Sequence, residues 1–223
     1  MSYPTLPPTC VKSRERRDHQ HTDEATMPLK GDVLAEYRGD ADYFGADAVV
    51  VRVDDLGNTG AGGALAAEHT ERIELMTSIA VAFARNPMVL ANIGNDLQAL
   101  SKGRFVLGLG SQIKPHITKR FSQEWSRPAA RMREFVLAMR AIWGSWHDGK
   151  PLEFTGKFYT HTLMTPFFTP TDCDYGAPKV FLAAVGPKVT EVAGEVADGM
   201  IAHAFTTESY LRNTTIPALE RGF

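Results

Sequence analysis

The stretch "VFLAAVGPKVTEVAGEVADG", residues 180–199, combines a short apolar run, a Gly-Pro turn, a helical pattern and an Asp-Gly ending. The apolar run at 180–184 predicts a buried strand, and Pro187 in a first helical turn predicts a helix that continues to Ala197. A further short apolar run at 199–203 predicts the next strand. Because a strand–helix–strand unit with a helical crossover joins parallel strands, this stretch indicates an α/β fold.

The same alternation runs through the rest of the chain. Apolar runs predict strands at 48–53, 73–82 and 104–109, and helical patterns are centred on 32–45, 87–102, 128–147 and 207–220. A small hairpin is predicted around "LEFTGKFY", residues 152–159. Strands that alternate with helices in this way form a parallel sheet, either doubly wound or closed into a (β/α) barrel.

Two glycine-rich segments bear on the choice between these architectures. "GLGSQIKPH", residues 108–116, has the first two glycines of a dinucleotide-binding turn but no third at the required place, and "GNTGAGG", residues 57–63, lacks the Lys-Ser/Thr ending of a phosphate loop. Neither segment therefore indicates a nucleotide-binding motif. The lack of such a motif favours the barrel over the doubly wound sheet.

Composition excludes several classes of protein. The 223 residues are 43% hydrophobic and 22% charged with a net charge of −2, which is typical of a globular protein of one or at most two domains. There is no basic surface signature for nucleic acid and no apolar run of about 18 residues for a membrane span. The two cysteines, Cys10 and Cys173, have no metal-binding or redox spacing, which fits a reducing cytoplasm.

Residues 1–26 read as a polar, disordered tail without a secretory signal, and residues 27–223 as the barrel domain. The tail carries His19 and His21. Two histidines in a solvated tail are a weak metal site, and no metal is expected.

The turn after the strand at 180–184 is the strongest candidate for ligand binding. Gly186 removes a side chain there, Pro187 starts a helix, and Lys188 adds an ammonium group. First-turn N–H groups, the positive end of the helix dipole and this ammonium group together suit a phosphate. The alternative is a tight turn without a ligand.

Two other strand ends consist of small residues. "TSIAVAF", residues 77–83, and "GLGSQ", residues 108–112, let a flat ligand approach the backbone, with the Ser111 and Gln112 side chains as hydrogen-bonding groups. Since all of these ends lie at one mouth of a parallel barrel, they suit a planar ring with a phosphate tail.

Acid–base groups are fewer. His203 lies at a strand end, His116 lies in the loop after 104–109, and Asp54 and Asp55 follow the strand at 48–53. For each, a ligand-facing role competes with a packing, solvated or turn-capping role. We expect His69, on the helix before a strand, to be structural.

Four ordered motifs together resemble the bacterial luciferase-like monooxygenase superfamily, and within it the actinobacterial oxidoreductases that use the deazaflavin coenzyme F-420. They are "ERIELMTSIAVAFARNP" (71–87), "SKGRFVLGLGSQ" (101–112), "FTGKFY" (154–159) and 180–199. The resemblance implies a TIM (β/α)8-type barrel that transfers hydride between F-420, or FMN as second choice, and a small organic substrate. It implies a non-proline cis peptide between Ser78 and Ile79, ring or ribityl contacts at Gly110 and Ser111, and the phosphate turn at Gly186 and Pro187.

The sequence also departs from the family. The segment before Pro28 has no strand pattern, "RVDDLGNTGAGGALAAEH" (52–69) lacks the usual polar group, for which Asp54 is the substitute, and the chain stops at Phe223 where relatives continue. A complete barrel needs roughly 250 residues, so we expect an incomplete one with open edges, covered in a homodimer. The alternative function is a non-catalytic relic or partner-binding fragment of such a barrel.

Overall fold

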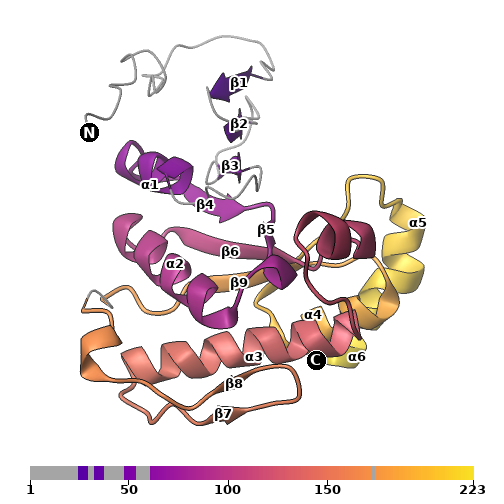
Figure 1. Ribbon diagram of the computed structural model, residues 1–223. Coiled ribbons are helices and arrows are strands. Elements are labelled where there is room, and N and C mark those ends of the chain that lie inside the picture. The colour runs from indigo at the N-terminus through magenta and orange to yellow at the C-terminus, as the bar shows by residue number, and fades with distance from the viewer. Residues whose placement is uncertain (1–24, 30–32, 38–47, 54–60, 172–173) are drawn as a thin grey trace.

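A computed structural model describes residues 25–29, 33–37, 48–53, 61–171 and 174–223 (Figure 1). Its main sheet contains, in spatial order, β1 (Ala25–Leu29), β2 (Val33–Tyr37), β3 (Ala48–Val53), β4 (Glu74–Thr77), β6 (Phe105–Gly110), β9 (Lys179–Ala183) and β10 (Gly199–Ile201). A short strand, β5 (Ala80–Val81), pairs with the end of β6. From β3 to β10 all neighbouring strands are parallel, whereas β1, β2 and β3 pair antiparallel.

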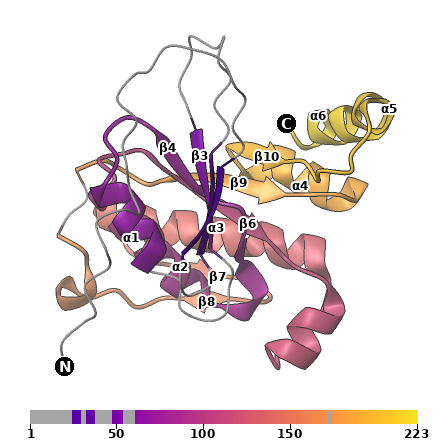
Figure 2. The same cartoon turned by 90° about the horizontal axis from the view of Figure 1, so that it is seen from above.

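Helices connect the parallel strands. They are α1 (Ala61–Glu68), α2 (Pro87–Leu100), α3 (Pro128–His147) and α4 (Pro187–Val196). After the last strand, α5 (Glu208–Tyr210) and α6 (Ile216–Gly222) follow, and α6 packs beside α4 (Figure 2). Shorter turns are η1 (Ala82–Ala84), η2 (His116–Arg120), η3 (Pro166–Phe168) and η4 (Leu211–Thr215), and a two-stranded hairpin is formed by β7 (Phe154–Thr155) and β8 (Thr160–His161). These are the units of a (β/α)8-type barrel, and among the described residues the sheet remains open, because β1 and β10 do not pair.

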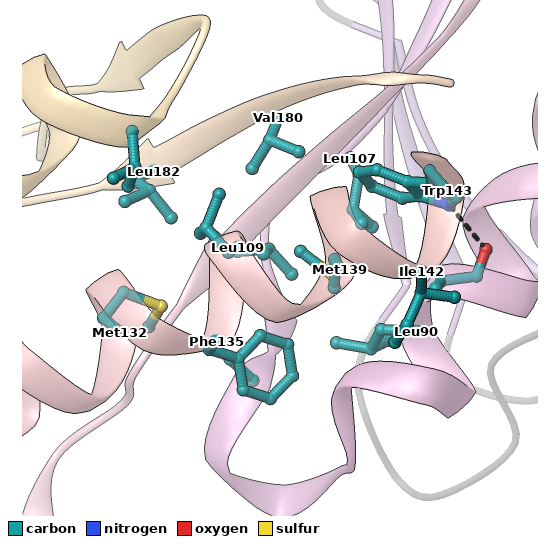
Figure 3. Packing of buried hydrophobic residues seen from close by; sticks show 14 of the residues in the cluster. Leu90, Leu107, Leu109, Met132, Phe135, Met139, Ile142, Trp143, Val180 and Leu182 are labelled. Atoms are coloured by element: carbon teal, nitrogen blue, oxygen red, sulfur yellow. Dashed lines mark hydrogen bonds between the residues drawn. The ribbon is translucent and has the colours of Figure 1, made fainter. Parts of the chain in front are cut away.

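The core lies between the sheet and the helices α2 and α3 (Figure 3). Alternate residues of the strands, including Leu107, Leu109 and Leu182, are fully buried against the apolar stripe of α3. The Trp143 indole N–H in that stripe donates to the Ala91 carbonyl of α2 at 3.1 Å. On the opposite face of the sheet Phe181 remains half-buried, as expected where the strands do not close around an interior.

The amino-terminal edge of the sheet is held by Arg104, which directly precedes β6. Its guanidinium donates to the carbonyl oxygens of Ala67, Thr70 and Ile73 at 3.1, 2.8 and 2.7 Å, and to Thr70 Oγ1 at 2.9 Å. One side chain therefore provides hydrogen-bond donors for three backbone carbonyl groups between the end of α1 and β4. A planar guanidinium with several donors suits such multiple bonding.

The structure confirms most predicted elements and corrects four. Residues 33–37, expected in a helix over 32–45, form β2, because they pair residue by residue with Val53 to Val49 of β3. β1 begins at Ala25, inside the expected tail, and residues 1–24, with Cys10, His19 and His21, lie outside the described residues.

The predicted strand at 73–82 is interrupted after Thr77, because the chain turns at a cis peptide and resumes as β5 and η1. The predicted last helix at 207–220 is divided into α5, a wider turn at Leu211–Thr215, and α6. Both differences are local backbone adjustments within the expected strand–helix order.

No helix within the described ranges is both long and apolar enough to cross a membrane. The described residues also contain no cluster of three His, Cys, Asp or Glu side chains placed to hold a metal ion. Cys173 lies outside the described residues.

Candidate functional site at the carboxyl ends of the strands

The parallel strands β4, β6, β9 and β10 end on the same side of the sheet, where ligands bind in parallel α/β folds. The predicted residues Ser78, Ser111, Gly186 and His203 all follow directly or closely after these ends. α5, coloured yellow, lies at this side of the sheet, at the right of Figure 1. The strand order thus brings residues from distant parts of the sequence to one edge.

The Ser78–Ile79 peptide is cis, as the family resemblance implied. Beyond it the Ile79 side chain extends to Gly110, where an added Cβ would collide with Ile79 Cδ1. A Cβ at Gly108 would collide with the Thr77 carbonyl oxygen, and the Thr77 hydroxyl donates to the Gly108 carbonyl at 2.8 Å. The protein's own atoms therefore occupy the space beside both glycines of β6, and Gly110 itself is buried.

The turn between β9 and α4 differs from the end of β6. Gly186 is the N-cap of α4, with φ −85° and ψ 151°, and an added Cβ would meet no neighbouring atom within 4 Å. Gly186, Pro187 and Lys188 are all exposed. Nothing in the described chain blocks this turn from a ligand.

The donors of this turn can be identified from its hydrogen bonds. Pro187 has no N–H, and the N–H groups of Val189 and Thr190 both donate to the Gly186 carbonyl at 3.1 Å. The Lys188 N–H and its ammonium group are then the principal donors for an anion. The residues present fit a phosphate group, with fewer free backbone N–H groups than the sequence suggested.

His203 follows β10 and is exposed. Its Nδ1 accepts the Phe205 N–H at 3.2 Å, and its ring lies 5.2 Å from the Phe205 ring. Because Nδ1 is an acceptor, the neutral imidazole carries its proton on Nε2. His203 can therefore donate a hydrogen bond from Nε2 to a ligand at this edge.

His116, at the start of η2, has the opposite arrangement. Its Nδ1 lies 3.2 Å from Gln112 Oε1, an atom that can only accept, so the neutral ring keeps its proton on Nδ1. Nε2 is then the basic nitrogen and faces solvent on an exposed side chain. No contact joins His116 to His203 in the described structure, and Asp54, the third predicted catalytic residue, lies outside the described residues.

Sequence reasoning missed a contact that orders this edge. The Tyr210 hydroxyl of α5 donates to the Val185 carbonyl at 3.0 Å, which ties α5 to the residue before Gly186. No local signal in the sequence relates two residues so far apart. The contact therefore places α5 next to the exposed turn at Gly186.

A cavity on the helix-facing side of the sheet reaches the end of β4, where Thr77 and Ile79 line it. Its lining is almost entirely apolar and comes from α1, α2 and the helix-facing side of β4 and β6, with Ala66, Leu75, Leu90, Leu97 and Leu107 among the lining residues. Its two polar side chains, Thr77 and Arg85, donate to the Gly108 and Val81 carbonyls, so they are committed to the protein's own backbone rather than to a cofactor. We therefore place the candidate site at the strand ends.

Curated relatives match about 70% of this chain. An uncharacterized protein of Mycobacterium tuberculosis is 61% identical over 158 residues, which cover 71% of this chain and 46% of that protein. The F-420-dependent glucose-6-phosphate dehydrogenase of Mycobacterium avium is 32% identical over 160 residues, covering 70% of this chain and 45% of that enzyme. The chain thus spans about half the length of the curated relatives that it matches.

Among solved structures, an F-420-dependent secondary alcohol dehydrogenase in complex with an F-420–acetone adduct superposes with a TM-score of 0.62 and 25% identity. The superposition covers 74% of this chain and 49% of that one. The sequence profile of the family described as luciferase-like monooxygenase matches residues 41–223. The chain therefore belongs to the luciferase-like monooxygenase family.

Proposed function

We propose that this protein is an oxidoreductase that binds coenzyme F-420 at the carboxyl edge of its sheet and acts on a small organic substrate. The observation that carries the proposal is the β9–α4 turn, which is exposed, free of side chains at Gly186 and followed by the Lys188 ammonium. F-420-dependent enzymes among the relatives support the choice of cofactor. When bound, the cofactor would supply the ring that exchanges hydride with the substrate.

The residues of the chain have distinct parts in this proposal. Lys188 would hold the phosphate, and the segment around the Ser78–Ile79 bond, with Ser111, would support the ring, whereas Gly110 would act only through the packing of Ile79. The His203 Nε2–H would donate a hydrogen bond to a polar atom of the ligand, and the His116 Nε2 would accept a proton. Asp54 is a second candidate for the residue that accepts the proton.

A fluorescence titration of the purified chain with F-420 and, separately, with FMN tests the proposal. We expect saturable binding of F-420 that is lost in the variant Gly186→Glu, because the carboxylate would repel a phosphate at this turn. Ala177→Glu is the matched control, since it adds the same charge at an exposed residue before the opposite end of β9. Equal affinity in both variants would show that the phosphate is not held at this turn.

A second candidate function is cofactor or partner binding without turnover. The sheet that stays open within the described residues favours it, because an open edge does not enclose a substrate. Steady turnover by the same purified chain would exclude this candidate. Sedimentation of that sample would also test the expected homodimer.

A further inference from the structure

A polar cleft lies beside the start of α3, apart from the turn at Gly186. It is bounded by residues 123–127 and by the turn of the β7–β8 hairpin. Its polar lining residues are Gln123, Glu124, Ser126, Arg127, Arg131 and Lys157. Three of these are cationic and one is anionic, so the lining is positive although the whole chain has a net charge of −2.

Arg131 is held in a fixed position in this cleft. Its Nε donates to the Tyr159 hydroxyl at 2.8 Å, and its Nη1 donates to the Glu124 carbonyl at 2.7 Å. Its guanidinium also stacks on two aromatic rings, 4.5 Å from the Phe83 centroid and 5.6 Å from the Tyr159 centroid. An arginine held in this way gives up little side-chain freedom when it binds a ligand.

The hairpin turn that carries Lys157 is also fixed. The Glu134 carboxylate of α3 accepts the N–H groups of Lys157, Phe158 and Tyr159 at 2.9, 2.6 and 2.7 Å. A carboxylate that accepts three backbone N–H groups sets the position of this turn strongly. The Lys157 ammonium itself has no acidic partner among the residues that the structure describes.

Arg127 completes the set. It precedes Pro128 at the start of α3, and its backbone has the left-handed conformation, with φ 38° and ψ 61°. Within the described ranges no carboxylate pairs with its guanidinium. One oriented arginine and two cations without an acidic partner thus line one cleft, and the backbone of each comes from a different part of the fold.

We propose that this cleft binds a small oxyanion, a molecule with several carboxylate groups or a phosphate, through Arg127, Arg131 and Lys157. Guanidinium and ammonium groups are the donors that bind such anions, and their charge-assisted hydrogen bonds are stronger than neutral ones. The site is distinct from the turn at Gly186 and goes beyond the proposed oxidoreductase function. Since the loop 111–127 leaves the carboxyl end of β6, the cleft lies toward the same side of the sheet as the candidate site.

Isothermal titration of the full chain with citrate, and separately with inorganic phosphate, tests the proposal at an ionic strength held constant with sodium chloride. We expect saturable binding of at least one anion, weakened about tenfold or more in the double variant Arg127→Ala/Lys157→Ala. Lys150→Ala is the matched control, because it removes a cation at the other end of α3, and it should bind as the wild type does. Thermal unfolding of each variant confirms that it is folded.

No saturable binding by the wild type, or equal binding by the wild type and the folded double variant, would overturn the proposal. A titration repeated with saturating F-420 identifies the source of the anion. Competition means that the cleft receives an anionic part of the cofactor, whereas independent binding means that it receives a separate anionic ligand. Because citrate and phosphate binding are measured without cofactor, failure here is distinguishable from failure to bind F-420.

Discussion

The ends of β6 and β9 carry glycines for opposite reasons. At β6, Gly108 and Gly110 leave room for the Thr77 carbonyl and the Ile79 side chain, so the absence of a side chain serves internal packing. At β9, Gly186 faces space that no described residue fills. A glycine at a strand end is therefore not by itself a sign of a ligand site, and the neighbours of its missing Cβ distinguish the two cases.

The largest expected effect is a loss of stability in the variant Gly108→Ala. In Gly108→Ala the new methyl group would collide with the Thr77 carbonyl oxygen, and a backbone atom of a central strand cannot move aside easily. We expect the free energy of unfolding to fall by about 3 kcal/mol. Urea denaturation followed by circular dichroism measures the change. A loss no larger than that of Gly186→Ala would break the comparison.

The next effect tests what fills the space at Gly110. Gly110→Ala should cost about 2 kcal/mol, because the methyl group collides with the terminal carbon of Ile79, which can adjust in part. Adding Ile79→Val removes that carbon. The double variant should then be more stable than the sum of the two single effects predicts, by about 1 kcal/mol. Additive effects in the same denaturation experiment would show that Ile79 is not the obstacle.

Gly156 extends the comparison to the β7–β8 turn. A Cβ at Gly156 would collide with the Glu134 carboxylate, which accepts the three N–H groups of the turn. We expect Gly156→Ala to cost about 1–2 kcal/mol, since displacing the carboxylate weakens its hydrogen bonds. In a protein that already carries Glu134→Ala, Gly156→Ala should lower the free energy of unfolding by much less. Unfolding curves of the four proteins measure this coupling, and an undiminished cost would contradict it.

The smallest effect on stability is expected at Gly186. Its φ of −85° suits any residue and no described atom lies near the added methyl group, so Gly186→Ala should change the free energy of unfolding by no more than about 0.5 kcal/mol. The affinity for F-420 should fall nonetheless, because the methyl group enters the space proposed for the phosphate. Denaturation and fluorescence titration of one preparation measure both. A large loss of stability would place Gly186 with the packed glycines.

Much of the fold could be predicted from local patterns. The helical patterns at 87–102 and 128–147 and the strand–turn–helix at 180–199 act within a few residues, and the structure contains each of them. β2 was misassigned, because "VLAEY" becomes a strand through pairing with β3, which lies beyond its own sequence neighbourhood.

The site could be predicted only in part. The cis peptide was predicted by resemblance and is present, and the openness of the Gly186 turn agrees with the sequence argument. The crowding of Gly108 by Thr77 could not be read, because these residues lie 31 positions apart and meet only across paired strands. The cationic cleft was also missed, since Arg131 and Lys157 come together through an aromatic stack and a hairpin that local spacing does not reveal.

Arg104 has a consequence for how such a protein can diversify. By holding the loop between α1 and β4 through four hydrogen bonds, it concentrates structural constraint at the amino edge of the sheet. In the loop 111–127 at the opposite edge Ile117 packs in the core, whereas Lys114, His116 and Lys119 are exposed. Mutations at the exposed positions of this loop can alter specificity at little cost in stability, so evolution can explore new substrates there while the scaffold stays unchanged.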